Sequence, residues 1–526
     1  MRRLIACWSL LGAVAITGCQ KSKDSAASAT APIVKVERIL ARVHFKGFQE
    51  LATDTNATTM RDVWQLPETG ELRSQALNKL APALASFLSG TTASTNGDVA
   101  ALARPLLDDV LQSETIFEVI DRTNRPPAWT LAIRLDSQRH TVWQQNGEKL
   151  IASRDPGNSS ILASKTATNS WFLLGGDNVT LGSATQIDTP LWRSAAELPS
   201  QSMGTHWCRA NVDWPRLTNT VPLLASIPLP RFDIMILGKG EGLRTEAHFH
   251  LTEPMRSELE PWRLPTNTIR DPLISFTALR GIGGWLDKQE WFRSMGLDAA
   301  PQQAVAWGQA DTPFQIQVAV PVSDATNAFE RLASTWVPQV NSNLLNSPID
   351  VVSVHTNLLQ MSGQMLFLRP FIRRAPEPSG EFLNGGIFPV APTTNAPPPA
   401  LFEQLNRTNL VYYDWEITEH RLKQLRETLE LLGILLTLPP MDEKSLAHRW
   451  VQAASPKLGN TITEITATSA TELSLVRRSH IGLNGLELLT LANWIEGTNF
   501  PIADLSVGFR PAPPSRKSDS SEQPKP

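Results

Sequence analysis

Apolar and polar residues alternate along several short segments of this chain, and this pattern restricts the possible folds more than any other feature. A period of two places successive side chains on opposite faces of a β-strand, so that one face is buried and the other faces water. The alternation is clearest at residues 39–45, 129–135, 243–251, 314–320 and 411–417. Half-buried strands of this kind are typical of antiparallel sheets, and we therefore predict a fold dominated by them.

Segments with a helical period lie between these strands. Residues 69–88 and 98–111 have the spacing of core-facing helices, and leucines recur every three or four residues from Leu422 to Leu436. Ser323-Asp324 is a candidate N-cap for a further helix. The mixture predicts an α+β fold of largely antiparallel sheets with packed helices.

The predicted elements recur in the same order in three places, near residues 37–147, 273–345 and 410–496. Each place reads as a strand, one or more helices, a hairpin and a further helix. Because recurring order is the signature of related modules, we predict a chain built from repeated β-α-β-β-α units. The alternative is chance recurrence of this order in a long α+β chain.

Shifts in composition divide the chain into regions. We predict a first α+β region with extra strands at 33–255, a second at 256–375 and a third at 401–510. Residues 376–400 are rich in proline and are predicted to be a linker between the last two regions. Residues 511–526 are charged and rich in proline and serine, which predicts a disordered tail.

The N-terminus has the three parts of an export signal in the correct order. Arg2-Arg3 is followed by an apolar run that ends at Ile16 and is too short to span a bilayer. Ile16-Thr17-Gly18-Cys19 resembles the box of the bacterial lipoprotein signal class, in which the cysteine receives a lipid. The resemblance implies a signal peptide at 1–18 and lipidation of Cys19.

Residues 19–32, which begin with the lipidated cysteine, are small and polar and are predicted to form a flexible tether. In the lipoprotein class, an aspartate directly after the cysteine favours retention in the inner membrane. Gln20 and Lys21 occupy those positions here. The resemblance therefore implies an envelope protein anchored to the outer membrane and facing the periplasm or the cell surface.

The cysteine count and the net charge exclude further classes. Cys7 leaves with the signal and Cys19 carries the lipid, so only Cys208 remains and no intramolecular disulfide can form. Cys208 lies in a strand-like run and is predicted to be a buried, inert thiol. The formal net charge of −3 gives no reason to expect nucleic acid as a partner.

His248 and His250 are the weak candidates for a metal site. Two residues apart on a strand, they share one face and could supply two ligands, but the sequence indicates no third ligand. The alternative is a solvated polar face of an antiparallel sheet. We predict no bound metal and no cofactor.

Asp414 and Glu416 share the strand face opposite Tyr413, and a carboxylate pair of this kind can be catalytic. They could equally pair with Arg421 or Arg477, or face water. The nucleophile-elbow and phosphate-loop motifs are absent from the sequence. We therefore assign no catalytic residue.

The sequence of two segments, from Leu410 to Glu416 and from Arg478 to Gly482, resembles that of uncharacterised exported bacterial proteins with repeated α/β units. That resemblance implies a fold and carries no activity. We expect a non-catalytic envelope lipoprotein that binds or scaffolds an envelope protein or glycan. The alternatives are a carrier of lipid or another apolar ligand, and an envelope hydrolase acting on glycan or peptide.

Overall fold

A computed structural model describes most of the chain between residues 38 and 501. The described part excludes 90–96, 123–124, 153–159, 167–170, 179–188, 194–205, 221–228, 256–258, 311–314, 345–351, 362–368, 389–394, 398, 436–442 and 499. The predicted signal peptide, the predicted lipidation site Cys19, the predicted tether and the predicted C-terminal tail lie outside the described residues.

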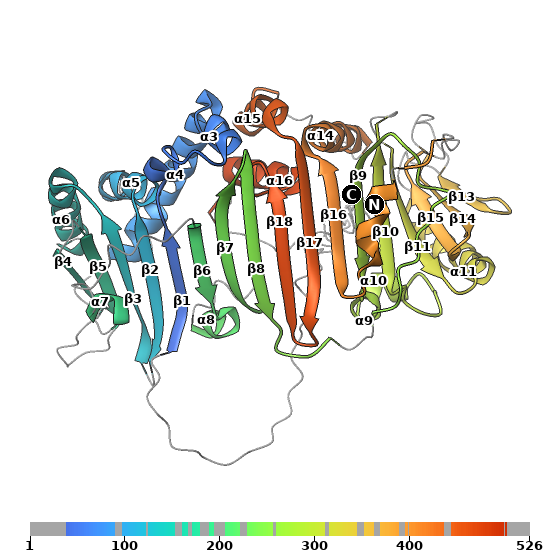
Figure 1. Ribbon diagram of the computed structural model, residues 1–526, viewed down its shortest axis with the longest axis horizontal. Coiled ribbons are helices and arrows are strands. Elements are labelled where there is room, and N and C mark those ends of the chain that lie inside the picture. Colours follow the sequence, from blue (N-terminus) through green and yellow to red (C-terminus); the bar gives the residue numbers. More distant parts are fainter. Residues whose placement is uncertain are drawn as a thin grey trace, which may run out of the picture.

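One antiparallel sheet of eighteen strands runs through the described part of the chain (Figure 1). Its first half, from one edge inward, is β4 (Ser160–Thr166), β5 (Trp171–Asn178), β3 (Arg125–Arg134), β2 (Thr115–Arg122), β1 (Arg38–Phe45), β6 (His206–Val212), β7 (Arg231–Lys239) and β8 (Gly242–His250). The second half continues with β18 (Glu472–Ser479), β17 (Asn460–Ser469), β16 (Leu410–Ile417), β9 (Leu273–Arg280), β10 (Gln303–Gln309), β11 (Ile316–Val322), β15 (Gly380–Gly386), β14 (Phe371–Glu377), β13 (Leu358–Met361) and β12 (Val352–Val354).

The two halves of the sheet meet at β8 and β18, the last strand of each half in chain order. From the outside inward, the first half has the order β3-β2-β1-β6-β7-β8. The second half has the corresponding order β11-β10-β9-β16-β17-β18. Along the seam, residues pair from Leu243 opposite Ser479 to His250 opposite Glu472.

The helices pack on the faces of the sheet and, in the view of Figure 1, gather mostly toward the ends of its strands. They are α2 (Phe48–Leu51), α3 (Thr58–Trp64), α4 (Pro67–Ser89), α5 (Gly97–Gln112), α6 (Ser137–Ala152), α7 (Pro190–Arg193), α8 (Trp214–Thr220), α9 (Gly283–Leu286), α10 (Glu290–Arg293), α11 (Ala325–Arg331), α12 (Val337–Leu344), α13 (Pro399–Glu403), α14 (Thr418–Leu435), α15 (Leu446–Ala454) and α16 (Gly485–Glu496). We call the sheet side beneath α14 and α16 the helical face, and the opposite side the outer face.

Helix α4, from the first half, packs on α15 and α16 from the second. Leu72 of α4 belongs to the same buried cluster as Trp450 and Leu488. The indole N–H of Trp450 donates to the Thr69 hydroxyl at 2.8 Å. The Lys79 ammonium donates to the carbonyl oxygens of Ile495, Glu496 and Gly497 at 2.8, 2.6 and 3.0 Å. A lysine at these otherwise unpaired carbonyls caps the C-terminus of α16, so the helical layer also joins the halves.

Among the residues that the structure describes, segments outside the sheet cover the outer face in both halves. In the second half, Leu405 and Ile269 pack over Phe276 and Trp307. In the first half, Leu191 covers strands β2, β3 and β5. At the seam, β8 carries a row of partly exposed polar side chains on its outer face, and its buried apolar side chains lie on the opposite face. The polar row consists of Arg244, Glu246, His248 and His250.

The predicted α+β class and the antiparallel sheet are confirmed. The predicted helices at 69–88 and 98–111 correspond to α4 and α5, and the Asp324 carboxylate caps α11 by accepting from the Asn327 N–H at 2.9 Å. The predicted linker at 376–400 is wrong in its first part. Strand β15 lies there and pairs with both β11 and β14, because the proline- and glycine-rich residues form a hairpin turn within the sheet.

Candidate functional site

A row of polar side chains crosses the helical face where Asp414 and Glu416 lie on β16. Thr277 of β9 and Thr463 of β17 stand opposite Asp414 on either side. Thr461 stands opposite Glu416. Because side chains alternate along a strand, Tyr413 points to the outer face and packs with Phe276. The sequence prediction that the two carboxyl groups share one face agrees with this register.

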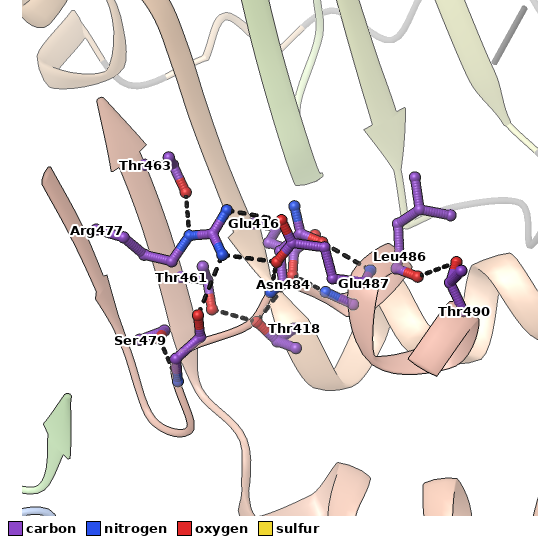
Figure 2. A network of polar contacts seen from close by, with 12 residues as sticks. Glu416, Thr418, Thr461, Thr463, Arg477, Ser479, Asn484, Leu486, Glu487 and Thr490 are labelled. Atoms are coloured by element: carbon purple, nitrogen blue, oxygen red, sulfur yellow. Dashed lines mark hydrogen bonds and ion pairs between the residues drawn. The ribbon is translucent and has the colours of Figure 1, made fainter. Parts of the chain in front are cut away.

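Glu416 contacts the first residues of two helices (Figure 2). Its Oε1 accepts a hydrogen bond from the Thr418 hydroxyl, at the start of α14, at 2.9 Å. The same oxygen accepts from the Gly485 backbone N–H, at the start of α16, at 2.7 Å. The Thr418 hydroxyl also lies 2.8 Å from the Thr461 hydroxyl. The carboxyl group thereby binds one of the N–H groups that a helix N-terminus leaves unpaired.

Asp414 has one satisfied oxygen and one unsatisfied oxygen. Its Oδ1 accepts from the Thr277 hydroxyl at 2.7 Å. Its Oδ2 is buried and has no hydrogen-bond partner. A buried carboxylate oxygen without a donor is unfavourable in its charged form, since water would have solvated it.

The Arg477 guanidinium makes the direct ion pair of the site (Figure 2). It donates to both oxygens of Glu487, at 2.6 and 2.9 Å, and to the Thr463 hydroxyl at 2.9 Å. Glu487 also forms a capping box with Asn484 at the start of α16. A bidentate, charge-assisted ion pair therefore joins Arg477 on the sheet to the first turn of α16.

Arg421 is the second cation, and it reaches the site from α14. Its Nη1 donates to the Gln424 Oε1 at 2.6 Å. Beneath it, Gly308 of β10 leaves room, since a β-carbon there would lie 2.7 Å from Gln424 Oε1 and 3.3 Å from Arg421 Nη1. Glycine at this position lets the polar side of α14 approach the sheet.

The electrostatics of the site follow from three carboxyl groups beside two guanidinium groups. Burial and the neighbouring Asp414 charge raise the pKa of Glu416 to about 7, against the opposing effect of Arg421 and the two hydrogen bonds. Burial also raises the pKa of Asp414. Burial lowers the pKa of Arg421, which the two carboxylates oppose. One proton on Glu416 would bring the formal charge of Asp414, Glu416, Glu487, Arg421 and Arg477 to zero.

This arrangement can hold a proton near neutral pH, and its position favours a structural role. Asp414 and Glu416 are only 5% and 3% exposed. A substrate would have to displace α14 or α16 to reach either group. The hypothesis that these carboxylates are associated with Arg421 and Arg477 therefore fits the geometry better than a catalytic pair does.

The raised pKa of Glu416 predicts that stability falls as pH rises. The unfolded chain releases this proton near pH 4.5 and the folded chain near pH 7, so the folded state binds more protons in that window. The contribution is fully present below pH 4.5 and is lost as pH rises through 7; it amounts to about 3 kcal/mol in total, most of which is lost between pH 5 and pH 8. Denaturant unfolding at pH 5 and pH 8 should show this difference between wild type and E416Q; equal pH slopes would contradict it.

His248 and His250 lie on the outer face, and each is beside a different carboxylate. His248 Nδ1 is 3.4 Å from Glu472 Oε1, and His250 Nε2 is 3.4 Å from Asp233 Oδ2. Within the described part of the chain, no three histidine, cysteine, aspartate or glutamate side chains are grouped to hold a metal ion. The two histidines lie on a partly exposed polar face, each beside one carboxylate.

Replacing His248 with alanine should therefore change stability little. Its side chain is 43% exposed, and exposed ion pairs contribute about 0 to 1 kcal/mol. We expect a change below about 1 kcal/mol in the free energy of unfolding at pH 6, measured by urea titration with and without zinc. A zinc-dependent stabilisation that H248A abolishes would instead indicate a metal site.

Some of the site could be found from sequence and some could not. Asp414, Glu416, Arg421 and Arg477 were singled out by type and spacing. Sequence reasoning missed Glu487 and Thr418, although Asn484-x-x-Glu487 before an apolar run is a recognisable capping pattern. Cys208 is half-buried, and burial raises its pKa, which fits an unreactive thiol.

No known protein family, curated protein or solved structure matches this chain. Among the helices that the structure describes, none is both long enough and apolar enough to cross a bilayer.

Proposed function

We propose that this protein is a lipid-anchored envelope lipoprotein that binds or scaffolds a partner and performs no catalysis. In this proposal the lipid on Cys19 attaches it to the outer membrane, and the sheet faces the periplasm or the cell surface. The observation that supports a binding role is the partly exposed polar row that β8 carries on the outer face.

The polar row on β8 and its carboxylate neighbours carry charges of both signs. Arg244 lies 2.6 Å from Glu246 on the same strand, and each of the two histidines has a carboxylate neighbour. These side chains are 27–43% exposed, so their contacts are weak and can be exchanged for contacts with a partner. A surface of mixed charge suits a polar protein surface better than a uniformly charged polymer.

A site-specific cross-link can test this surface. A photo-reactive residue in place of Ser474, next to His248 on the outer face, would be activated in native membranes. The matched control carries the same residue in place of Lys423, which is exposed on α14. We expect one discrete adduct from position 474 and none of that mass from position 423. The absence of an adduct at 474, or identical adducts at both positions, would refute a partner site on the outer face.

Cys19→Ala should abolish lipid attachment. Without the lipid, the chain loses the anchor that the signal resemblance implies, because no other long apolar run exists in the sequence. We expect no incorporation of a labelled fatty acid and recovery of the protein in the soluble envelope fraction. A mutant that stays in the membrane fraction as firmly as wild type would contradict the anchor.

We also propose that the chain is built from repeated β-α-β-β-α units. The order strand, helices, hairpin, helix occurs at β1 to α6, at β9 to α11 and at β16 to α16. In each, the first strand pairs with the second and the second with the third, all antiparallel. The segment from β6 to β8 has the same first four elements, which supports the proposal further.

A further inference from the structure

Helix α16 is held by polar contacts at both of its ends. At its start, the Gly485 N–H donates to Glu416, and Glu487 pairs with Arg477. At its end, Lys79 of α4 binds the last carbonyl oxygens. Between them, Leu488 and Leu489 pack against residues of α3, α4 and α15. The position of α16 therefore affects how the helical layer joins the two halves.

Glu416 is the point at which the sheet contacts both α14 and α16. Its Oε1 accepts from Thr418 and from Gly485, and the side chain is almost completely buried. Movement of α16 away from the sheet would break the bond to Gly485 and admit water to the carboxyl group. The same movement would hydrate the unpaired Asp414 Oδ2. Both effects favour the charged form of the pair.

The charges around Glu416 come from every element packed against it. On its own strand are Asp414 and Tyr412; on the helices are Arg421 and Glu487; on β18 is Arg477. With all acids ionised, three carboxylates face two guanidinium groups. Arg477 is engaged directly by Glu487, although its charge still favours ionised Asp414, and Arg421 is the cation that acts on both Asp414 and Glu416.

We propose that Glu416 is a proton-operated latch, which keeps the start of α16 docked on the sheet while it is protonated and releases it on ionisation. The proton leaves to solvent as the helix opens, and no other chemical change is needed. The helix is then free at its N-terminal end, and α4 loses part of the surface on which it packs. The pKa of Glu416, raised to about 7, places the change within a mild pH range.

Amide hydrogen exchange of the full chain tests the latch. For an acid with folded and open pKa values of 7 and 4.5, linkage predicts an opening constant about tenfold larger at pH 8 than at pH 6. After correction for intrinsic exchange, the α16 amides should lose about tenfold protection over this range. Amides of β1 and β2 serve as the reference for global unfolding. Because global unfolding also exposes Glu416, they should lose protection with pH as well, but they should remain better protected than the α16 amides at both pH values, which identifies the opening of α16 as local.

Two variants make the test decisive. E416Q, which imitates the protonated group, should leave α16 protection independent of pH. E118Q removes another completely buried carboxylate, one that accepts from the Leu191 N–H on the outer face, and it should keep the wild-type pH response of α16. Equal protection of α16 at pH 6 and pH 8 in wild type would overturn the proposal, as would a pH response that persists in E416Q.

A third variant covers the case in which E416Q does not fold. Thr418→Val removes a hydrogen bond that favours the ionised form of Glu416. The midpoint of the α16 exchange transition should therefore move to higher pH. A midpoint that is unchanged or moves to lower pH would refute the assignment of the transition to Glu416.

Discussion

Replacing Arg421 with methionine is expected to lower the free energy of unfolding by about 3 kcal/mol at pH 8. At that pH Glu416, with a pKa of about 7, is largely ionised, and Arg421 favours the charged forms of both Glu416 and Asp414. Methionine keeps much of the apolar stem, which passes Gly485, but supplies no charge. Loss of the Arg421 charge therefore leaves buried carboxylates without a compensating cation. Urea unfolding monitored by tryptophan fluorescence measures the resulting change in the free energy of unfolding.

The pH dependence and a double variant separate charge from packing. At pH 5, where Glu416 is protonated, R421M should lower the free energy of unfolding by less than it does at pH 8. R421M/E416Q should recover part of the loss, because one of the uncompensated charges is gone. Lys423→Met is the matched control, an exposed cation on the same helix, and should change stability by less than about 0.5 kcal/mol. An R421M penalty that is equal at both pH values would show that packing alone is lost.

Replacing Ala247 with proline is expected to lower the free energy of unfolding by about 4 kcal/mol or more, because proline in a strand disrupts the backbone and such effects are among the few that cause losses of this size. Ala247 is buried in β8, where it pairs with Ile234 of β7 and Leu475 of β18. Proline removes an amide donor and does not fit the interior of a central strand. Because β8 and β18 join the halves, we expect calorimetry to resolve two unfolding transitions instead of one.

An edge strand supplies the control for this substitution. Ser353 lies in β12, which pairs with β13 on one side and is the last strand of the sheet. Proline there can disturb pairing on one side only, so S353P should cost less than A247P and should leave the number of transitions unchanged. If A247P unfolds in a single transition at the wild-type temperature, the β8–β18 seam does not determine how the halves unfold together.

Strands could be predicted from sequence because their signal is local. The alternation of β16 is visible within eight residues, and it correctly placed Asp414 and Glu416 on one face. The pairing of β8 with β18 has no local signal, since the two strands are more than 200 residues apart. A pattern restricted to neighbours in sequence could not show that one sheet crosses all three predicted regions.

The leucine stripe of α14 was only partly predictive. Leu422 is buried, but Leu429 is 37% exposed. The reason lies in the sheet beneath the helix, which is polar where the two meet. Gln424 and Thr428 are therefore buried at positions that a hydrophobic stripe would give to apolar side chains. A helix over a polar surface does not follow the apolar period that sequence analysis assumes.

The protonation state of the site could not be predicted from residue types. Two carboxyl groups and two arginines in sequence suggest a balanced set of charges. The structure adds Glu487 as a third acid and leaves Asp414 Oδ2 without a donor. Only the distances show that Arg477 is engaged by Glu487, so that the carboxyl pair depends on Arg421 and on protonation.

The seam between β8 and β18 also sets an order of events during synthesis. Strand β8 is complete long before its partner exists, because residue 250 pairs with residue 472. At about 5 to 20 residues per second, the ribosome needs at least about 10 s to supply β18. During that interval the first half has an unpaired edge, which is the feature of nascent sheets most prone to wrong association. A chaperone that binds unpaired strand edges would therefore be needed most before β18 is made, and the pairing of β18 would end that need.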